Sequence, residues 1–277
     1  TTSGVSSGST TNDANIALTF TSSKTTTTFV SGHITVTNGS ISSFAGSGTT
    51  YTATFTPFSA GATTIDVAGS VFTDAAGNNN TAATQFSWTY DNVAPTMTIA
   101  STTSGVTNGS TTNDGSITLT FTSSKATTTF DSNDITVTGA GGLSFSGSGT
   151  TYTATFTPSS AGTYTFDVAG SVFTDAVGNN NTAATQFSWT YDNVPPTMTI
   201  TAKDTNDNVV SHNSTTSAQT LLFTFRSSKA TTNFALGDIT LSSNITTAFF
   251  ETTDNIVYTL QVTPSVAGSN TVSVAGS

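Results

Sequence analysis

Acidic and amide side chains recur at matching places along the chain, and their chemistry is that of a calcium site. Ca²⁺ takes six to eight hard oxygen ligands from carboxylates, amides and backbone carbonyls. Such side chains gather at Asn12-Asp13, Asp74 with Asn78–Asn80, and Asp91-Asn92, and again at Asn113-Asp114, Asp175 with Asn179–Asn181, and Asp192-Asn193. The alternative is that these side chains cap turns by bonding their own backbone. Their recurrence would then follow from duplication alone.

Catalytic residues are sparse. The chain has two histidines, His33 and His212, and they occupy unrelated places; the counterpart of His33 in the next repeat is Asp134. A Ser-His-Asp arrangement needs one histidine held by a fixed acid. We therefore expect no active site and no enzyme activity. No cofactor is expected other than Ca²⁺ at domain junctions.

One lysine recurs at the equivalent position of each repeat and is preceded each time by two serines: Lys24, Lys125 and Lys229. An intramolecular Lys–Asn isopeptide bond would need a buried lysine beside an asparagine and an acid. The context is typical of a loop just after a strand, which argues against that bond.

Composition limits the partners. Only 7% of the 277 residues are charged, and the net charge is −10. The sequence has no basic patch, so a nucleic-acid partner is not expected. No apolar run approaches the ~20 residues that a membrane-spanning helix needs, so membrane insertion is not expected either. Serine and threonine make up about two residues in five.

A long internal repeat organises the chain. Residues 1–99 align without a gap with residues 102–200, and about four positions in five are identical. A third copy is more divergent. We predict three domains: residues 1–93 with the first strand missing, residues 94–194, and residues 195–277 with the last strand missing. We expect the sequence to be a window on a longer array.

Apolar residues alternate with hydroxyl residues in each repeat, as in Ile16–Phe20, Tyr51–Phe55 and Phe86–Tyr90. This period of two predicts half-buried antiparallel strands. About seven short strands in ~100 residues predict an all-β fold of tandem immunoglobulin-like, Greek-key β-sandwich repeats. The predicted core aromatics are Phe20, Tyr51, Phe55 and Trp88, with Phe121, Tyr152, Phe156 and Trp189 in the second copy.

In such a sandwich, loops from consecutive domains meet where the domains join. Asp13, Asp91 and Asp175 are therefore expected to converge on one junction and to bind Ca²⁺ there. Asp114 and Asp192 are the corresponding candidates at the second junction. That junction is compromised, because the third copy has Ser217-Ala218 where the others have Asn-Asp.

The ordered motifs SGSTTND, LTFTSSK, GSGTTYTATFTP, VFTDAAGNNNTA and YDNVAPT together resemble the bacterial Ig-like repeat domains of large cell-surface and adhesin proteins. The resemblance covers nearly the whole chain. It implies an immunoglobulin-like sandwich, an extracellular or cell-surface location, no enzyme activity, and a role in adhesion, biofilm matrix or stalk extension. It also supports junction calcium, which related adhesins use to stiffen their arrays.

Three functions remain open. The chain is expected to be a structural spacer or stalk whose partners are neighbouring repeats of the same chain. Alternatively, it is a subunit of a self-assembling extracellular filament or sheath in which copies exchange strands. The third alternative is a carbohydrate-binding module, which is supported only by the aspartates and asparagines in the loops.

Overall fold

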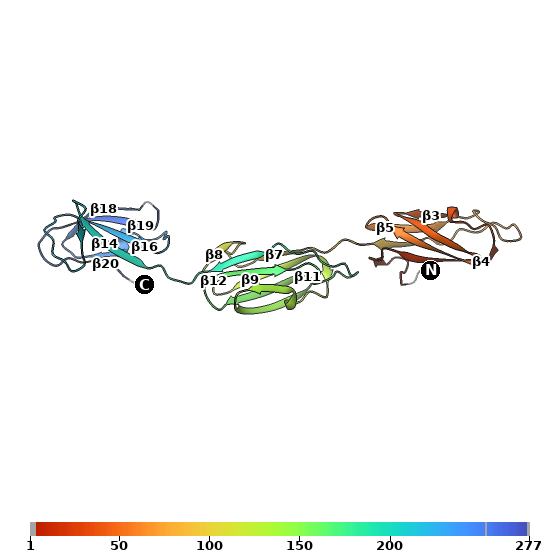
Figure 1. Ribbon diagram of the computed structural model, residues 1–277, viewed down its shortest axis with the longest axis horizontal. Helices are drawn as coiled ribbons and strands as arrows, with labels where there is room; N and C mark the ends of the chain where they lie inside the picture. The colour runs from red at the N-terminus through yellow and green to blue at the C-terminus, as the bar shows by residue number, and fades with distance from the viewer. Residues whose placement is uncertain (1–3, 253, 276–277) are drawn as a thin grey trace. The chain divides into compact units, whose positions relative to one another are not determined.

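The computed structural model describes residues 4–252 and 254–275, which divide into two compact units, residues 1–193 and 194–277. Within these residues the fold is all-β, as predicted (Figure 1). The only helical segments described are three-residue 3₁₀ turns, η1 (Ser31–His33), η2 (Ser132–Asp134) and η3 (Leu236–Asp238). The first unit contains repeats one and two, and the second unit contains repeat three.

Repeat two shows the sandwich in its fuller form. One sheet has the order β11-β9-β7 and the other the order β10-β12-β13-β8. All neighbours are antiparallel except β8 and β13, which run parallel. The strands are β7 (Met97–Ser101), β8 (Ser110–Thr112), β9 (Ile117–Thr127), β10 (Ile135–Thr138), β11 (Gly141–Pro158), β12 (Gly162–Val168) and β13 (Phe187–Tyr191).

Repeat one has the same sandwich without a counterpart of β7 among the described residues. Its sheets have the orders β2-β4 and β1-β6-β5-β3. The strands are β1 (Thr10–Thr11), β2 (Ile16–Thr26), β3 (Ile34–Thr37), β4 (Gly39–Pro57), β5 (Gly61–Val67) and β6 (Phe86–Tyr90). A first strand built from Thr1–Val5 would lie largely outside the described residues, because residues 1–3 are not described.

The long strands β4 and β11 each fold back on themselves. Phe44 stacks on Tyr51 and Phe145 stacks on Tyr152, with ring centroids 5.7 Å apart in both pairs. A side chain at Gly46, whose φ is +130°, would collide with the Thr50 carbonyl, so the reversal requires glycine there. The GSGTT segment is thus a hairpin turn, as its glycines predict.

Repeat three forms a five-stranded sheet of order β15-β14-β16-β19-β18 and a two-stranded sheet of β17 and β20. Its insertion, KDTNDN, forms a hairpin in which Asp204 accepts hydrogen bonds from the Asn206 and Asn208 amides. The strands are β14 (Met198–Asp204), β15 (Val209–Val210), β16 (Leu221–Ser227), β17 (Ile239–Leu241), β18 (Ile245–Thr252), β19 (Val257–Pro264) and β20 (Val272–Val274).

The core follows the alternation of apolar residues. Seven of the eight predicted core aromatics are buried, and Phe20 is only half-buried. The reason lies in strand pairing. Phe121, the counterpart of Phe20, pairs with Ile99 of β7, whereas no described strand lies beside β2 at that edge. The prediction was therefore wrong only where the covering strand is not in place.

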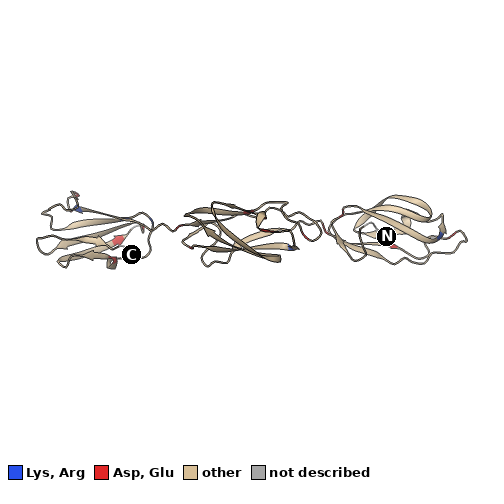
Figure 2. Cartoon of the chain, turned by 90° about the horizontal axis from the view of Figure 1, so that it is seen from below, with Lys and Arg blue, Asp and Glu red and all other residues tan. Residues whose placement is uncertain are grey.

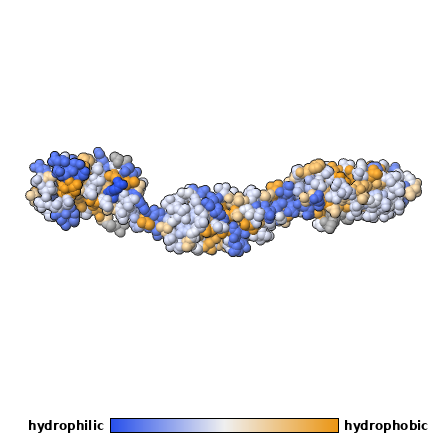
Figure 3. Space-filling model, in the orientation of Figure 1, coloured by the Kyte–Doolittle hydropathy of each residue, from blue (hydrophilic) through white to orange (hydrophobic). Residues whose placement is uncertain are grey.

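The outer faces of the sheets carry hydroxyl ladders. The Thr37 and Thr64 hydroxyl oxygens lie 2.8 Å apart across β3 and β5, and Thr138 faces Thr165 in the same way. Charged segments are rare on the ribbon, and most of the visible surface has the pale colour of weakly polar residues (Figures 2 and 3). Cross-strand threonine pairs suit such a surface because they are both β-branched and hydrogen-bonding.

Lys229 lies just after the end of β16, as expected, whereas the other two Ser-Ser-Lys segments lie inside strands, contrary to the sequence-based expectation. They occupy β2 and β9 at a β-bulge, where the pairing with the neighbouring strand shifts between Thr21 and Thr26 and between Thr122 and Thr127. A bulge leaves residues unpaired and re-aims their side chains. The bulge in β9 sets the direction of Lys125.

Candidate functional site at the junction of repeats one and two

Lys125 lies where repeat one ends and repeat two begins. Its ammonium group lies 2.7 Å from both carboxylate oxygens of Asp91 and 2.9 Å from Oδ2 of Asp175. It also donates to the backbone carbonyl of Val93 at 2.5 Å. One lysine thus neutralises two carboxylates and binds the linker backbone. We call Lys125, Asp91 and Asp175 the junction triad.

Asp175 is held in place by its own loop. The Val177 and Asn179 amides donate to its Oδ1, and the Asn179 side-chain amide donates to its Oδ2. Only 3% of its side chain is exposed. Burial raises the pKa of this carboxyl, but the hydrogen bonds from Asn179 and Lys125 outweigh burial, and the net pKa is lowered. Asp175 is therefore a carboxylate at neutral pH.

The same surroundings shift the pKa of Lys125 in the opposite direction. Burial lowers its pKa, but the hydrogen bonds and charges of Asp91 and Asp175 outweigh burial and raise the net pKa. The lysine is therefore cationic at neutral pH. Two partly buried anions and one cation, all hydrogen-bonded, satisfy the condition under which a partly buried ion pair is stable.

Asp91 belongs to both repeats. Its backbone amide donates to the Thr11 carbonyl of β1 in repeat one. Its carboxylate binds Lys125, and its carbonyl accepts a hydrogen bond from the Asn179 side chain at 2.9 Å, both in repeat two. A single residue therefore links the last strand of one sandwich to a loop of the next.

The rest of the linker is fastened to repeat two. The Thr182 amide donates to the Pro95 carbonyl at 3.0 Å, and Thr96 exchanges hydrogen bonds with Ser124. Pro95 is buried and has a fixed φ, so the linker loses little further entropy on docking. Few backbone rotations remain unrestrained between β6 and β7.

Two of the three aspartates predicted to converge here do meet, and they meet on a lysine ammonium. Asp91 and Asp175 share Nζ of Lys125, while the carboxylate of Asp13 accepts a hydrogen bond from Thr11 of its own turn. Within the described ranges, no three acidic, histidine or cysteine side chains are grouped as metal ligands. Calcium binding stays a prediction, in which Ca²⁺ would compete with Lys125.

The candidates for the second junction are placed as follows. Asp114 follows β8 and is half-buried, and the Asp192 amide donates to the Thr112 carbonyl, as Asp91 does to Thr11. In repeat three, Lys229 donates to the Val194 carbonyl at 2.6 Å, which matches the bond from Lys125 to Val93. The lysine-to-linker contact is thus repeated in the second unit.

The other acidic clusters show the turn chemistry that the sequence left as an alternative. Asp74 accepts hydrogen bonds from the Ala76 and Asn78 amides. Bonds from Asn78 and from Lys24 hold its pKa well below its usual range. Asn181, which is buried, accepts from Val172 and Phe173 and donates to two carbonyls. These side chains are occupied in shaping their loops.

The histidines lie apart from this site. His33 is half-buried in η1, where its Nδ1 accepts from the Val30 amide at 3.4 Å, and His212 is exposed in repeat three.

Comparison with known proteins now places the fold in a family. Residues 2–90 and 91–191 each match the bacterial Ig-like domain. The chain belongs to the bacterial Ig-like domain family. The second match begins at Asp91, so it includes the linker and β7 with the repeat that follows them.

One solved structure with similarity to the chain is the crystal structure of invasin, a bacterial integrin-binding protein. The match covers 97% of this chain and 55% of the invasin chain, at 15% sequence identity and a TM-score of 0.35. This chain therefore spans about half the length of that protein. No match was found among curated proteins. None of the helices in the described part of the chain is long and apolar enough to cross a membrane.

Proposed function

We propose that the chain is a non-catalytic spacer or stalk segment of an extracellular surface protein that acts in adhesion or in a biofilm matrix. Membership of the bacterial Ig-like family supports this, as do the two nearly identical repeats. Identical modules in tandem suit a mechanical role better than the recognition of different ligands. The observation that carries the proposal is the junction triad, because a spacer must resist bending where its domains join.

The chemistry of the triad supports a junction that needs no metal. A divalent cation between Asp91 and Asp175 would offset their repulsion, and the Lys125 ammonium offsets it with a covalently attached charge. Its side chain is 25% exposed, so the attraction is screened less by salt than that of a fully solvated pair. A stalk stiffened in this way would keep its junction at any calcium concentration.

Small-angle scattering of the full chain tests this proposal. We expect Lys125→Ala to lower the maximum dimension or broaden the distance distribution, because the linker loses its charged contact. Lys203→Ala is the control, since Lys203 forms an exposed pair with Asp207 within the hairpin of repeat three. An unchanged distribution for Lys125→Ala would contradict the proposal.

Calcium is tested with the same measurement. If Lys125 is the cation of the junction, adding Ca²⁺ or a chelator leaves the distance distribution of the wild-type chain unchanged. A distribution that contracts in chelator and recovers with Ca²⁺ would instead assign the stiffness to a calcium site that includes Asp13, Asp91 and Asp175.

A filament subunit is the second candidate function. The observation that favours it is the uncovered edge of β2 in repeat one, because an extended segment of another chain can pair with this edge and add a strand to the sheet. Sedimentation of the full chain separates the two candidates, because a spacer stays monodisperse and a filament subunit forms large assemblies.

A further inference from the structure

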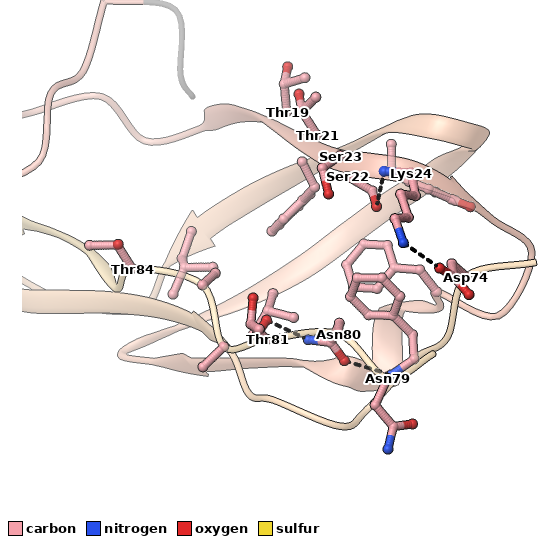
Figure 4. Close-up of a pocket in the computed structure, with 18 of the residues that line it drawn as sticks. Thr19, Thr21, Ser22, Ser23, Lys24, Asp74, Asn79, Asn80, Thr81 and Thr84 are labelled. Atoms are coloured by element: carbon pink, nitrogen blue, oxygen red, sulfur yellow. Dashed lines mark hydrogen bonds and ion pairs between the residues drawn. The ribbon is translucent and has the colours of Figure 1, made fainter. Parts of the chain in front are cut away.

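Repeat one contains an apolar groove of about 580 Å³ between β2 and the segment of residues 78–84 (Figure 4). Apolar side chains line its length: Leu18, Phe20, Phe29, Ile65, Val67 and Phe86. Lys24 and Asp74 stand at one end, where the lysine ammonium lies 3.0 Å from Oδ2 of Asp74. The groove therefore combines an apolar floor with a charged end.

The same place in repeat two is filled by β7. Ile99 pairs with Phe121, and Met97 of β7 is itself buried. In repeat three, β14 takes this place, with Ile200 paired with Phe225. Four groove residues of repeat one are half-buried while their counterparts in repeat two are buried; the pairs are Phe20 and Phe121, Val67 and Val168, Phe72 and Phe173, and Phe86 and Phe187.

The charged end of the groove shows the same difference. Lys125 binds two aspartates, one from its own repeat and one from the linker, and is 25% exposed. Lys24 binds Asp74, which is the counterpart of Asp175. It has no described partner that corresponds to Asp91, and its side chain is 67% exposed. Thr81, the counterpart of the Thr182 that binds the Pro95 carbonyl, also lines the groove. Each contact of the linker and β7 thus has a matching group in repeat one.

We infer that this groove is the receptor for the linker strand of another repeat of the same type. The occupant is an extended segment with the chemistry of residues 91–101. An aspartate binds Lys24, and a strand with two apolar residues on one face follows it and pairs with β2. This inference deepens the proposed spacer function and rests on it, since a spacer joins repeats in series.

A labelled peptide of residues 91–101, DNVAPTMTIAS, tests the proposal with the full chain by fluorescence anisotropy. We expect saturable binding. The control peptide DNVAPMTITAS has the same composition but moves both apolar residues to the opposite face. It should bind about 100-fold more weakly, because two large side chains would stay in water. Equal affinity for the two peptides would overturn the proposal.

The charged end is tested separately. Lys24→Ala in the chain, or Asp91→Asn in the peptide, should each weaken binding about 3-fold, and both changes together should weaken it no further. Lys203→Ala should leave the affinity unchanged. A combined loss that equals the product of the single losses would contradict the contact between the aspartate and Lys24.

Hydrogen exchange locates the bound peptide. Protection is expected in β2 and not in β9, where β7 already occupies the corresponding edge. Protection confined to β9 would overturn the proposal. Self-association of the chain that the peptide does not reverse would also overturn it, because a different segment of a second copy would then occupy the groove. None of these outcomes depends on Lys125, so they are independent of the scattering test of the junction.

Discussion

Repeats one and two share about four residues in five, yet their cores differ in completeness. Phe121 and Phe187 are buried in repeat two, whereas Phe20 and Phe86 are half-buried in repeat one. The sequences at these positions are the same, so composition cannot explain the difference. The difference is β7, the strand that directly follows the linker. The first strand after the linker therefore contributes to the core of repeat two.

The two tryptophans show the same contrast at a polar atom. Trp189 donates its Nε1 hydrogen to the Thr112 hydroxyl at 2.9 Å. The corresponding Thr11 hydroxyl donates instead to Asp13, and among the described residues buried Nε1 of Trp88 has no hydrogen-bond partner. A buried donor without a partner lowers stability. Repeat one should therefore be less stable than repeat two on two counts.

Replacing the tryptophans should give the largest effects. Trp189→Ala and Trp88→Ala should each cost about 3–5 kcal/mol of unfolding free energy, because each removes a large buried ring. The loss should be greater for Trp189, which also has a hydrogen bond to lose. Hydrogen exchange of each repeat in urea measures the two unfolding free energies within one chain. A greater loss at Trp88 would break the comparison.

Removing the lysines should separate the repeats next. Lys125→Ala leaves the buried Asp175 carboxylate without its cation and should cost repeat two about 1–3 kcal/mol. Lys24→Ala should change the stability of repeat one by less than the error of measurement, because Lys24 is 67% exposed and Asp74 keeps its hydrogen bonds from the Ala76 and Asn78 amides. Thermal unfolding of the two variants beside wild type measures the difference.

Acid provides the control for that prediction. The pKa of Asp175 is lowered in the folded state, so its contribution is present above the unfolded pKa and is lost as the pH falls through the folded pKa. The difference between wild type and Lys125→Ala should therefore stay constant from about pH 5 to 8 and shrink below about pH 4. A difference that grows in acid would contradict the role of Asp175.

The hydroxyl beside each tryptophan should give the smallest effect. Thr112→Val removes the acceptor of Trp189 and should cost about 1 kcal/mol. Thr11→Val should cost less, because Thr11 does not accept a hydrogen bond from Trp88. Urea unfolding followed by tryptophan fluorescence compares the variants. Equal costs would show that the two indoles have equivalent surroundings in solution.

The fold could be predicted from the sequence because alternation and turn residues act locally. Tyr51, Ala53 and Phe55 alternate with threonines, and they are buried as that pattern requires. The half-buried state of Phe20 could not be predicted, because it depends on whether a second strand lies beside β2, and none does among the described residues. Periodicity shows which face of a strand is apolar, and it does not show whether a neighbour covers that face.

The candidate site was predicted in part. Asp91 and Asp175 meet, as expected from their positions at the exit of repeat one and in a loop at the entry end of repeat two. Their partner Lys125 was missed because Ser-Ser-Lys looks like a loop, whereas a β-bulge turns the lysine into the junction. The signal was present in the sequence, since Lys24, Lys125 and Lys229 recur in register while the chain has only five basic residues.

The parallel pairing of β8 with β13 has a consequence for a protein under tension. The chain enters repeat two through the linker and β7, reaches β8 next, and leaves the repeat at the end of β13. A force that stretches the chain pulls these parallel neighbours in opposite directions along their length. Their hydrogen bonds are then loaded together in shear and do not open one after another. Repeat one has the same pair in β1 and β6, so in these two sandwiches a stretching force acts on the parallel pair in the direction in which a sheet resists rupture best.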